Sequence, residues 1–151
     1  MRRILIGACL LITACGSRST LLEPIPPDLL SSPTTIMVSG SPVVMSFALV
    51  TITTGRGVDL LGTIQTTNAT QISGASVGRV WLVHGNVAWV ANASRVPDPL
   101  PPDVIEKFTT AGGPKWPLGD TVDVVIEVRD VSGKAQLLQA PRQTIGPADP
   151  V

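Results

Sequence analysis

Residues 120–129 read Asp-Thr-Val-Asp-Val-Val-Ile-Glu-Val-Arg, the most regular stretch of the chain. Four apolar side chains share one face of an extended backbone here: Val122, Val124, Ile126 and Val128. The charged side chains Asp123, Glu127 and Arg129 occupy the other face. Because side chains alternate across a strand, this period of two predicts a strand with one buried and one solvated face. The turn residues Asp-Val-Ser-Gly at 130–133 then predict a return strand over 134–140.

Further strands are expected at short intervals before this hairpin. They cover residues 35–38, 43–52, 58–66, 79–84 and 87–92. Glycine and proline number 14 each, and this frequency of turn residues favours short strands over helices. We therefore predict an all-β fold. The expected architecture is an antiparallel β-sandwich of about seven or eight strands, with a small closed β-barrel as the alternative.

The stretch 94–119 is the least regular part of the chain. Pro102 and Asp103 suit the first turn of a helix, so one or two helical turns reaching Phe108 are expected. Asp103 and Glu106 would then share a solvated helix face, because residues three apart lie on the same side of a helix.

Two tryptophans lie on a hairpin that is expected to turn at Gly85-Asn86. In the register set by this turn, Trp81 faces Val90 across the hairpin, and Trp89 points to the opposite face of the sheet. We expect one indole in the core and the other under a loop. The alternative is that the second indole is exposed for a partner.

His84 and Trp116 complete the set of candidate binding residues, together with Trp81 and Trp89. His84 is the only histidine and lies beside the expected turn, where a solvated residue is favoured over a catalytic one. Trp116 stands between Lys115 and Pro117, and we expect it to plug an open end of the core rather than to form a ligand platform.

The N-terminus has the layout of a secretory signal peptide: Arg2 and Arg3 precede an apolar run from Ile4 to Ile12. The run is too short to cross a bilayer as a helix. Its end, Ile-Thr-Ala-Cys at 12–15, resembles the lipobox of bacterial lipoproteins. The resemblance implies that residues 1–14 are removed and that Cys15 is lipidated, which would attach the protein to the outer membrane if the cell has one.

Residues 15–33 are rich in proline and serine, and we expect them to form a tether between the lipid and a domain over residues 34–146. An extended tether of this length would hold the domain on the order of 50 Å from the membrane. The alternative is that part of the segment packs on the domain through its leucines. Residues 147–151 are expected to be a polar tail.

The stretch 118–134, Leu-Gly-Asp-Thr-Val-Asp-Val-Val-Ile-Glu-Val-Arg-Asp-Val-Ser-Gly-Lys, is similar to the late strand-turn-strand unit of bacterial immunoglobulin-like domains. This resemblance implies an immunoglobulin-like sandwich. The chain departs from that pattern in having no tyrosine for the corner motif and no cysteine pair.

The composition argues against several classes of function. The chain has 11 basic and 11 acidic residues, and loss of Arg2 and Arg3 leaves a net charge of −2, which does not suit nucleic-acid binding. With Cys9 removed and Cys15 acylated, the mature chain would have no free thiol. We predict no metal, no cofactor and no enzymatic activity.

The sequence therefore predicts a lipid-anchored envelope protein whose β-sandwich contacts another protein or the cell wall without catalysis. Its membrane contact would be the N-terminal lipid. The alternative is a lipoprotein that binds a small ligand or a glycan through Trp81 or Trp89 near His84.

Overall fold

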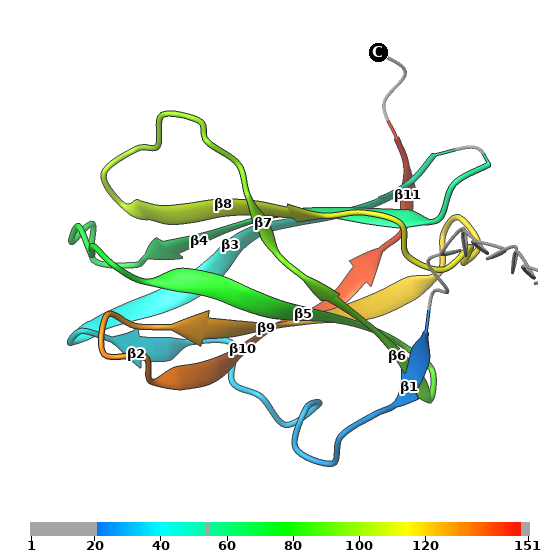
Figure 1. Cartoon of the computed structure of the whole chain (residues 1–151), viewed down its shortest axis with the longest axis horizontal. Helices are drawn as coiled ribbons and strands as arrows, with labels where there is room; N and C mark the ends of the chain where they lie inside the picture. Colours follow the sequence, from blue (N-terminus) through cyan, green and yellow to red (C-terminus); the bar gives the residue numbers. More distant parts are fainter. Residues whose placement is uncertain (1–20, 54, 149–151) are drawn as a thin grey trace, which may run out of the picture.

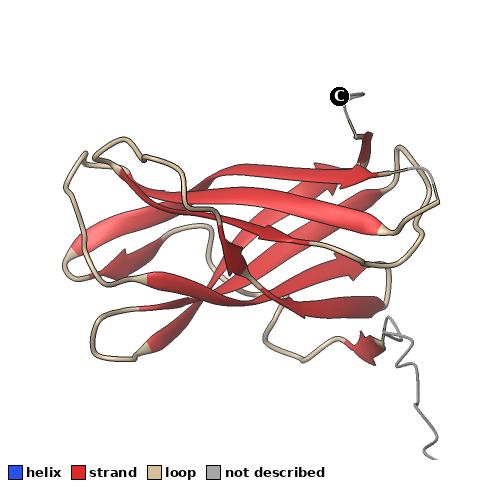
Figure 2. Ribbon diagram, turned by 45° about the horizontal axis from the view of Figure 1, so that its top comes forward, coloured by secondary structure: helices blue, strands red, loops and turns tan. Residues whose placement is uncertain are grey.

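The computed structural model describes residues 21–53 and 55–148. Within these ranges the regular secondary structure consists of β-strands, with no helix. Eleven strands form two sheets that pack face to face and do not close into a barrel (Figures 1 and 2). The predicted β-sandwich is confirmed. The strand number exceeds the predicted seven or eight because three very short strands and one unexpected long strand are added.

The two sheets have the following strand orders. Sheet 1 runs β1 (Leu22–Pro24), β6 (Val87–Asn92), β5 (Ser76–His84), β9 (Thr121–Arg129) and β10 (Ala135–Thr144). Sheet 2 runs β11 (Gly146–Pro147), β3 (Ser41–Ile52), β4 (Val58–Thr66), β8 (Val104–Thr110) and β7 (Ser94–Arg95), and β2 (Ile36–Val38) also pairs with β3. Neighbouring strands are antiparallel, except that β11 pairs with β3 in parallel.

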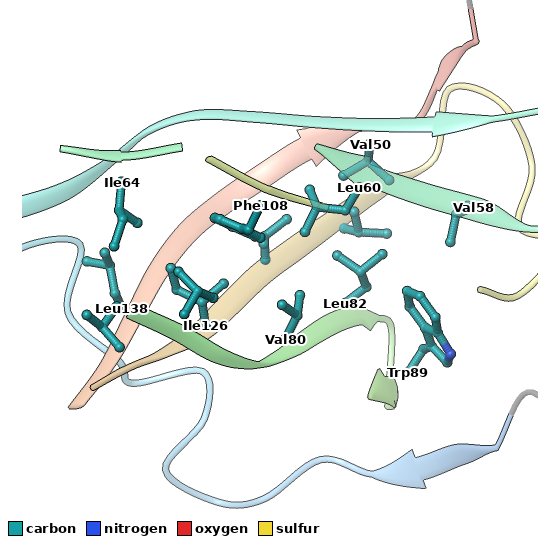
Figure 3. Packing of buried hydrophobic residues seen from close by; sticks show 14 of the residues in the cluster. Val50, Val58, Leu60, Ile64, Val80, Leu82, Trp89, Phe108, Ile126 and Leu138 are labelled. Atoms are coloured by element: carbon teal, nitrogen blue, oxygen red, sulfur yellow. The ribbon is translucent and has the colours of Figure 1, made fainter. Parts of the chain in front are cut away.

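The main core lies between the two sheets. The predicted inward face of β9 is confirmed, since Val122, Val124, Ile126 and Val128 are each at most 1 % exposed. Leu60 and Phe108 of sheet 2 point toward Val80, Leu82 and Ile126 of sheet 1 (Figure 3). Burial of such side chains is the dominant favourable term in folding.

The predicted turn at 130–133 joins β9 to β10. The carboxylate of Asp130 accepts hydrogen bonds from the Ser132 amide at 2.9 Å, the Ser132 hydroxyl at 2.6 Å and the Lys134 amide at 3.0 Å. The bond from the Ser132 hydroxyl is the main reason that the pKa of Asp130 is lowered. Gly133 has a φ of 84°, which glycine adopts at little cost.

The expected helix over 103–108 is absent, and residues 104–110 instead form strand β8. Its register places Phe108 opposite Gly62 and Glu106 opposite Ile64 of β4. The stretch is rich in β-branched residues, and β4 offers it an unpaired edge, so the tertiary pairing outweighs the local helix signal. Glu106 is therefore not on a solvated helix face. It is only 4 % exposed.

Residues 21–33 were expected to belong to a free tether, but they pack on the domain. β1 pairs with β6, and Leu29 is 1 % exposed in a second apolar cluster on the outer face of sheet 1. This is the alternative in which part of the segment packs on the domain. The predicted signal peptide, Cys15 and the rest of the tether, up to residue 20, lie outside the described residues.

The end of the domain also extends further than predicted. Gly146 and Pro147 pair with β3, and the amide of Ala148 donates to the carbonyl of Ile52 at 3.2 Å. The expected tail therefore begins no earlier than residue 149, and residues 149–151 lie outside the described residues.

Candidate functional site

The tryptophan hairpin has the predicted register. Trp81 pairs with Val90, Leu82 pairs with Trp89, and Gly85 adopts a φ of 60° at the turn. The two indoles point to opposite faces of sheet 1, as predicted. Both are buried: Trp89 is 5 % exposed in the main core, and Trp81 is 9 % exposed in the second cluster.

Trp81 is covered by the segment that connects β1 to β2. Leu29 of this segment packs in the same cluster as Trp81, and the partly buried Ile25 packs against that cluster. Val125 of β9 faces away from the main core, but it is fully buried because it packs in this same covered cluster. This is the expected arrangement in which a loop covers the second indole. Neither tryptophan of the hairpin therefore presents a ring face for stacking on a ligand.

His84 connects the tip of the hairpin to the residues just before β9. Its Nε2 lies 2.8 Å from Oδ2 of Asp120, and its ring stacks on Trp116 with centroids 4.9 Å apart and an interplanar angle of 24°. The His84 side chain is 31 % exposed, so it is partly solvated at the edge of the turn and is also held by these two contacts. Trp116 is 8 % exposed and belongs to the main core cluster, as expected for a plug.

The contacts of His84 with Asp120 and Trp116 hold the hairpin tip against the segment before β9. The side-chain hydrogen bond of His84 within the described residues is the one to Asp120. Among the same residues, no cluster of three histidine, cysteine, aspartate or glutamate side chains could hold a metal ion. No helix long and apolar enough to cross a bilayer occurs in the described ranges.

Sequence reasoning missed an apolar row on the outer face of sheet 2. Phe47 and Leu49 of β3 are 46 % and 39 % exposed. Their orientation results from a bulge at Ser46, where the register with β4 shifts by one residue between Met45 and Phe47. A strand without this bulge would have placed both side chains in the core, since Val43 and Met45 point inward. The only signal in the sequence is the polar Ser46 inside an apolar run.

A cavity of about 610 Å³ opens at the end of the sandwich opposite His84. Its wall includes Glu106 of β8 and Arg95 of β7, neither of which the sequence indicated as a site residue. The alternation of Glu106, Phe108 and Thr110 in a stretch rich in β-branched residues was the available signal for an inward-facing strand.

No family model, curated protein or solved structure matches this chain, so its geometry and its sequence features carry the functional argument.

Proposed function

We propose that this is a lipid-anchored protein of the bacterial envelope whose β-sandwich binds a protein partner through the outer face of sheet 2. The observation that carries the proposal is the exposed pair Phe47 and Leu49 on that face. Large apolar side chains that gather on an otherwise regular sheet surface are typical of protein contact sites.

Residues that pair across the strands show that this face is largely apolar or uncharged around Phe47 and Leu49. Leu49 lies opposite Leu61, which lies opposite Thr109, and Phe47 lies opposite Thr63. The charged residue in the second row is Lys107, whose ammonium lies 2.6 Å from a carboxylate oxygen of Asp98. A sheet face with exposed apolar side chains and few charges suits another protein surface better than a small ligand.

The two faces of the sandwich differ in how the chain covers them. On sheet 1, the segment before β2 lies over Trp81 and Val125. On sheet 2, Phe47 and Leu49 remain open to solvent. The asymmetry supports one outer face as a contact surface and the other as a part of the folded core.

The anchor would hold the β1 edge of sheet 1 close to the bilayer. Seven residue steps separate Cys15 from Leu22, the first residue of β1, and a chain of this length spans at most about 25 Å. The distance is roughly half of what a tether over 15–33 would allow. The anchored domain would therefore meet its partner near the membrane.

The ligand-binding alternative loses its proposed contacts, because both hairpin tryptophans are buried and the His84 ring is stacked on Trp116. The protein-contact function is therefore the better supported of the two.

The test is site-specific photo-crosslinking of the full chain in the cells that produce it. Benzoylphenylalanine at position 47 should give one discrete protein adduct, and the same group at position 131 should not. Val131 is a suitable control because it is 74 % exposed but lies on the β9–β10 turn. Phe47→Asp should also remove the adduct formed from a probe at position 49. Equal adducts from positions 47 and 131, or none from position 47, would contradict the proposal.

A further inference from the structure

The cavity opposite His84 has the size and lining of a small-molecule site. Its volume of about 610 Å³ lies within the usual range for ligand pockets, roughly 300–1,000 Å³. The β4–β5 loop contributes Ile72, and the segment before β8 contributes Leu100 and Pro101. The rest of the lining includes polar residues such as Gln71 and Ser76 and two charged residues, Glu106 and Arg95.

Glu106 is the unusual member of this wall. It is an inward-facing carboxyl two residues from the fully buried Phe108, and it is 4 % exposed. Burial raises its pKa and outweighs the lowering effects of the nearby Val77 amide and of the charge of Arg95. No cation of the described residues lies within ion-pair distance of it. A carboxylate has about four acceptor sites, and Glu106 is one of the residues that line the cavity.

Arg95 provides a positive charge at the rim of the same cavity. It pairs with Phe108 across β7 and β8, so its side chain leaves from the inner face of sheet 2, the face that carries Glu106. Arg95 is exposed at the edge of the sheet, and its charge acts on Glu106 through space. The cavity therefore has an anionic group in its wall, a cationic group at its rim, and both apolar and polar side chains in the rest of its lining.

We propose that this cavity binds a free α-amino acid with an apolar side chain. Its ammonium group would donate to the open acceptor sites of Glu106, and its carboxylate would pair with the guanidinium of Arg95. Its side chain would pack against Ile72, Leu100 and Pro101. A zwitterion of this kind matches both charges at once and supplies the cation that the buried carboxylate lacks.

The test is a nuclear magnetic resonance titration of the full chain with L-leucine. The amide signal of Val77 reports on the site because Val77 lines the cavity. We expect a saturable shift of this signal. Leucinamide, which lacks the carboxylate, and 4-methylpentanoate, which lacks the amine, should each bind at least about tenfold more weakly.

Two variants and one control separate the charges. Glu106→Gln should weaken leucine binding at least about tenfold, and Arg95→Gln should weaken binding of leucine but not of leucinamide. Glu127→Gln is the matched control, because Glu127 lies on β9 outside the cavity and is paired with Arg129. Thermal melts of each variant establish that it is folded, and Arg95→Gln changes an exposed residue that the core does not need.

Two results would overturn the proposal. One is the absence of a saturable shift at Val77 with millimolar L-leucine in the folded wild-type chain. The other is equal affinity for leucine and 4-methylpentanoate, which would mean that Glu106 takes no part in binding. Both results are independent of crosslinking at position 47, so this inference and the proposed protein contact succeed or fail separately.

Discussion

Phe108 is fully buried because the residue opposite it, Gly62, has no side chain. A Cβ added at Gly62 would lie 2.4 Å from Cζ of the Phe108 ring, well inside contact distance. The ring lies among core side chains of both sheets (Figure 3). At the residue scale, the Phe108 ring occupies the space that a side chain at position 62 would need. Glycine within a strand otherwise weakens a sheet.

Gly62→Ala should therefore destabilise the fold by about 1–3 kcal/mol, because the core must shift to admit one methyl group. Urea unfolding followed by tryptophan fluorescence measures this change. Phe108→Leu is the second arm of a double-mutant cycle, since the smaller side chain should relieve the clash and make the double variant more stable than the sum of the single changes predicts. Strict additivity would show that the two residues do not constrain one another.

Glu106 gives the stability a dependence on pH. Its pKa is raised in the folded protein, first by burial, while the Val77 amide and the charge of Arg95 offset part of this shift. A folded pKa above the unfolded one means that the folded state binds the proton more tightly. The ionised Glu106 therefore costs stability at neutral pH, and this cost disappears as the pH falls through the folded pKa toward the unfolded one.

The comparison of wild type with Glu106→Gln isolates this effect. The free energy of unfolding of the wild type, relative to that of the variant, should rise as the pH falls through this window. Urea denaturation at a series of pH values measures both proteins. A difference that stays constant from neutral pH to about pH 4 would show that Glu106 titrates alike in the folded and unfolded chains.

At the scale of elements, the segment between β1 and β2 acts as a cover for sheet 1. β1 has only three residues and is exposed along its length, so pairing with β6 alone gives it little stability. Its attachment depends on Leu29, which packs beside Trp81 and Val125. The same contact buries the indole of Trp81, so the segment between β1 and β2 and the β5–β6 hairpin stabilise one another.

Leu29→Ala should cost about 2–5 kcal/mol, since it removes a fully buried side chain from this cluster. It should also shift tryptophan emission to longer wavelength, because Trp81 becomes more accessible to water. Leu30→Ala is the matched control: Leu30 is 45 % exposed, and its replacement should change the stability by less than about 0.5 kcal/mol. Similar losses from both variants would contradict a specific role of Leu29.

Strand β8 and the β3 bulge are two features that the local sequence pattern did not predict. The β9 strand, its turn and the hairpin register followed from alternation and turn residues, which are local properties. By contrast, Pro102 and Asp103 suit a helix locally, and only pairing with β4 makes residues 104–110 a strand. The bulge at Ser46 is decided by the fit of β3 on β4, and it turns Phe47 and Leu49 to the outside.

At the scale of the whole molecule, the proposed anchor and the packed N-terminal segment together set where the domain can lie. The chain between Cys15 and Leu22 is short, so the β1 edge of sheet 1 would stay near the bilayer. Two or more acyl chains make such an attachment durable, because each buried methylene contributes about 0.8 kcal/mol.

Cys15→Ser should move the protein from the membrane fraction to the soluble fraction, because the acyl chains then have no attachment point. Fractionation followed by immunoblotting measures the change. Cys9→Ser is the matched control and should leave the distribution as it is, since Cys9 lies within the predicted signal peptide. Unchanged partitioning of Cys15→Ser would contradict lipidation at this residue.

The sequence by itself determined the all-β class, the strand and turn at 120–134, the hairpin register and the opposite orientation of Trp81 and Trp89. These features depend on side-chain alternation and on turn residues, which act over a few neighbours. Only the tertiary structure decided that residues 21–33 cover sheet 1, that β8 replaces the expected helix and that Glu106 and Arg95 meet at one cavity. Each of these depends on contacts between segments far apart in the chain, whose burial outweighs the local preference of the residues that make them.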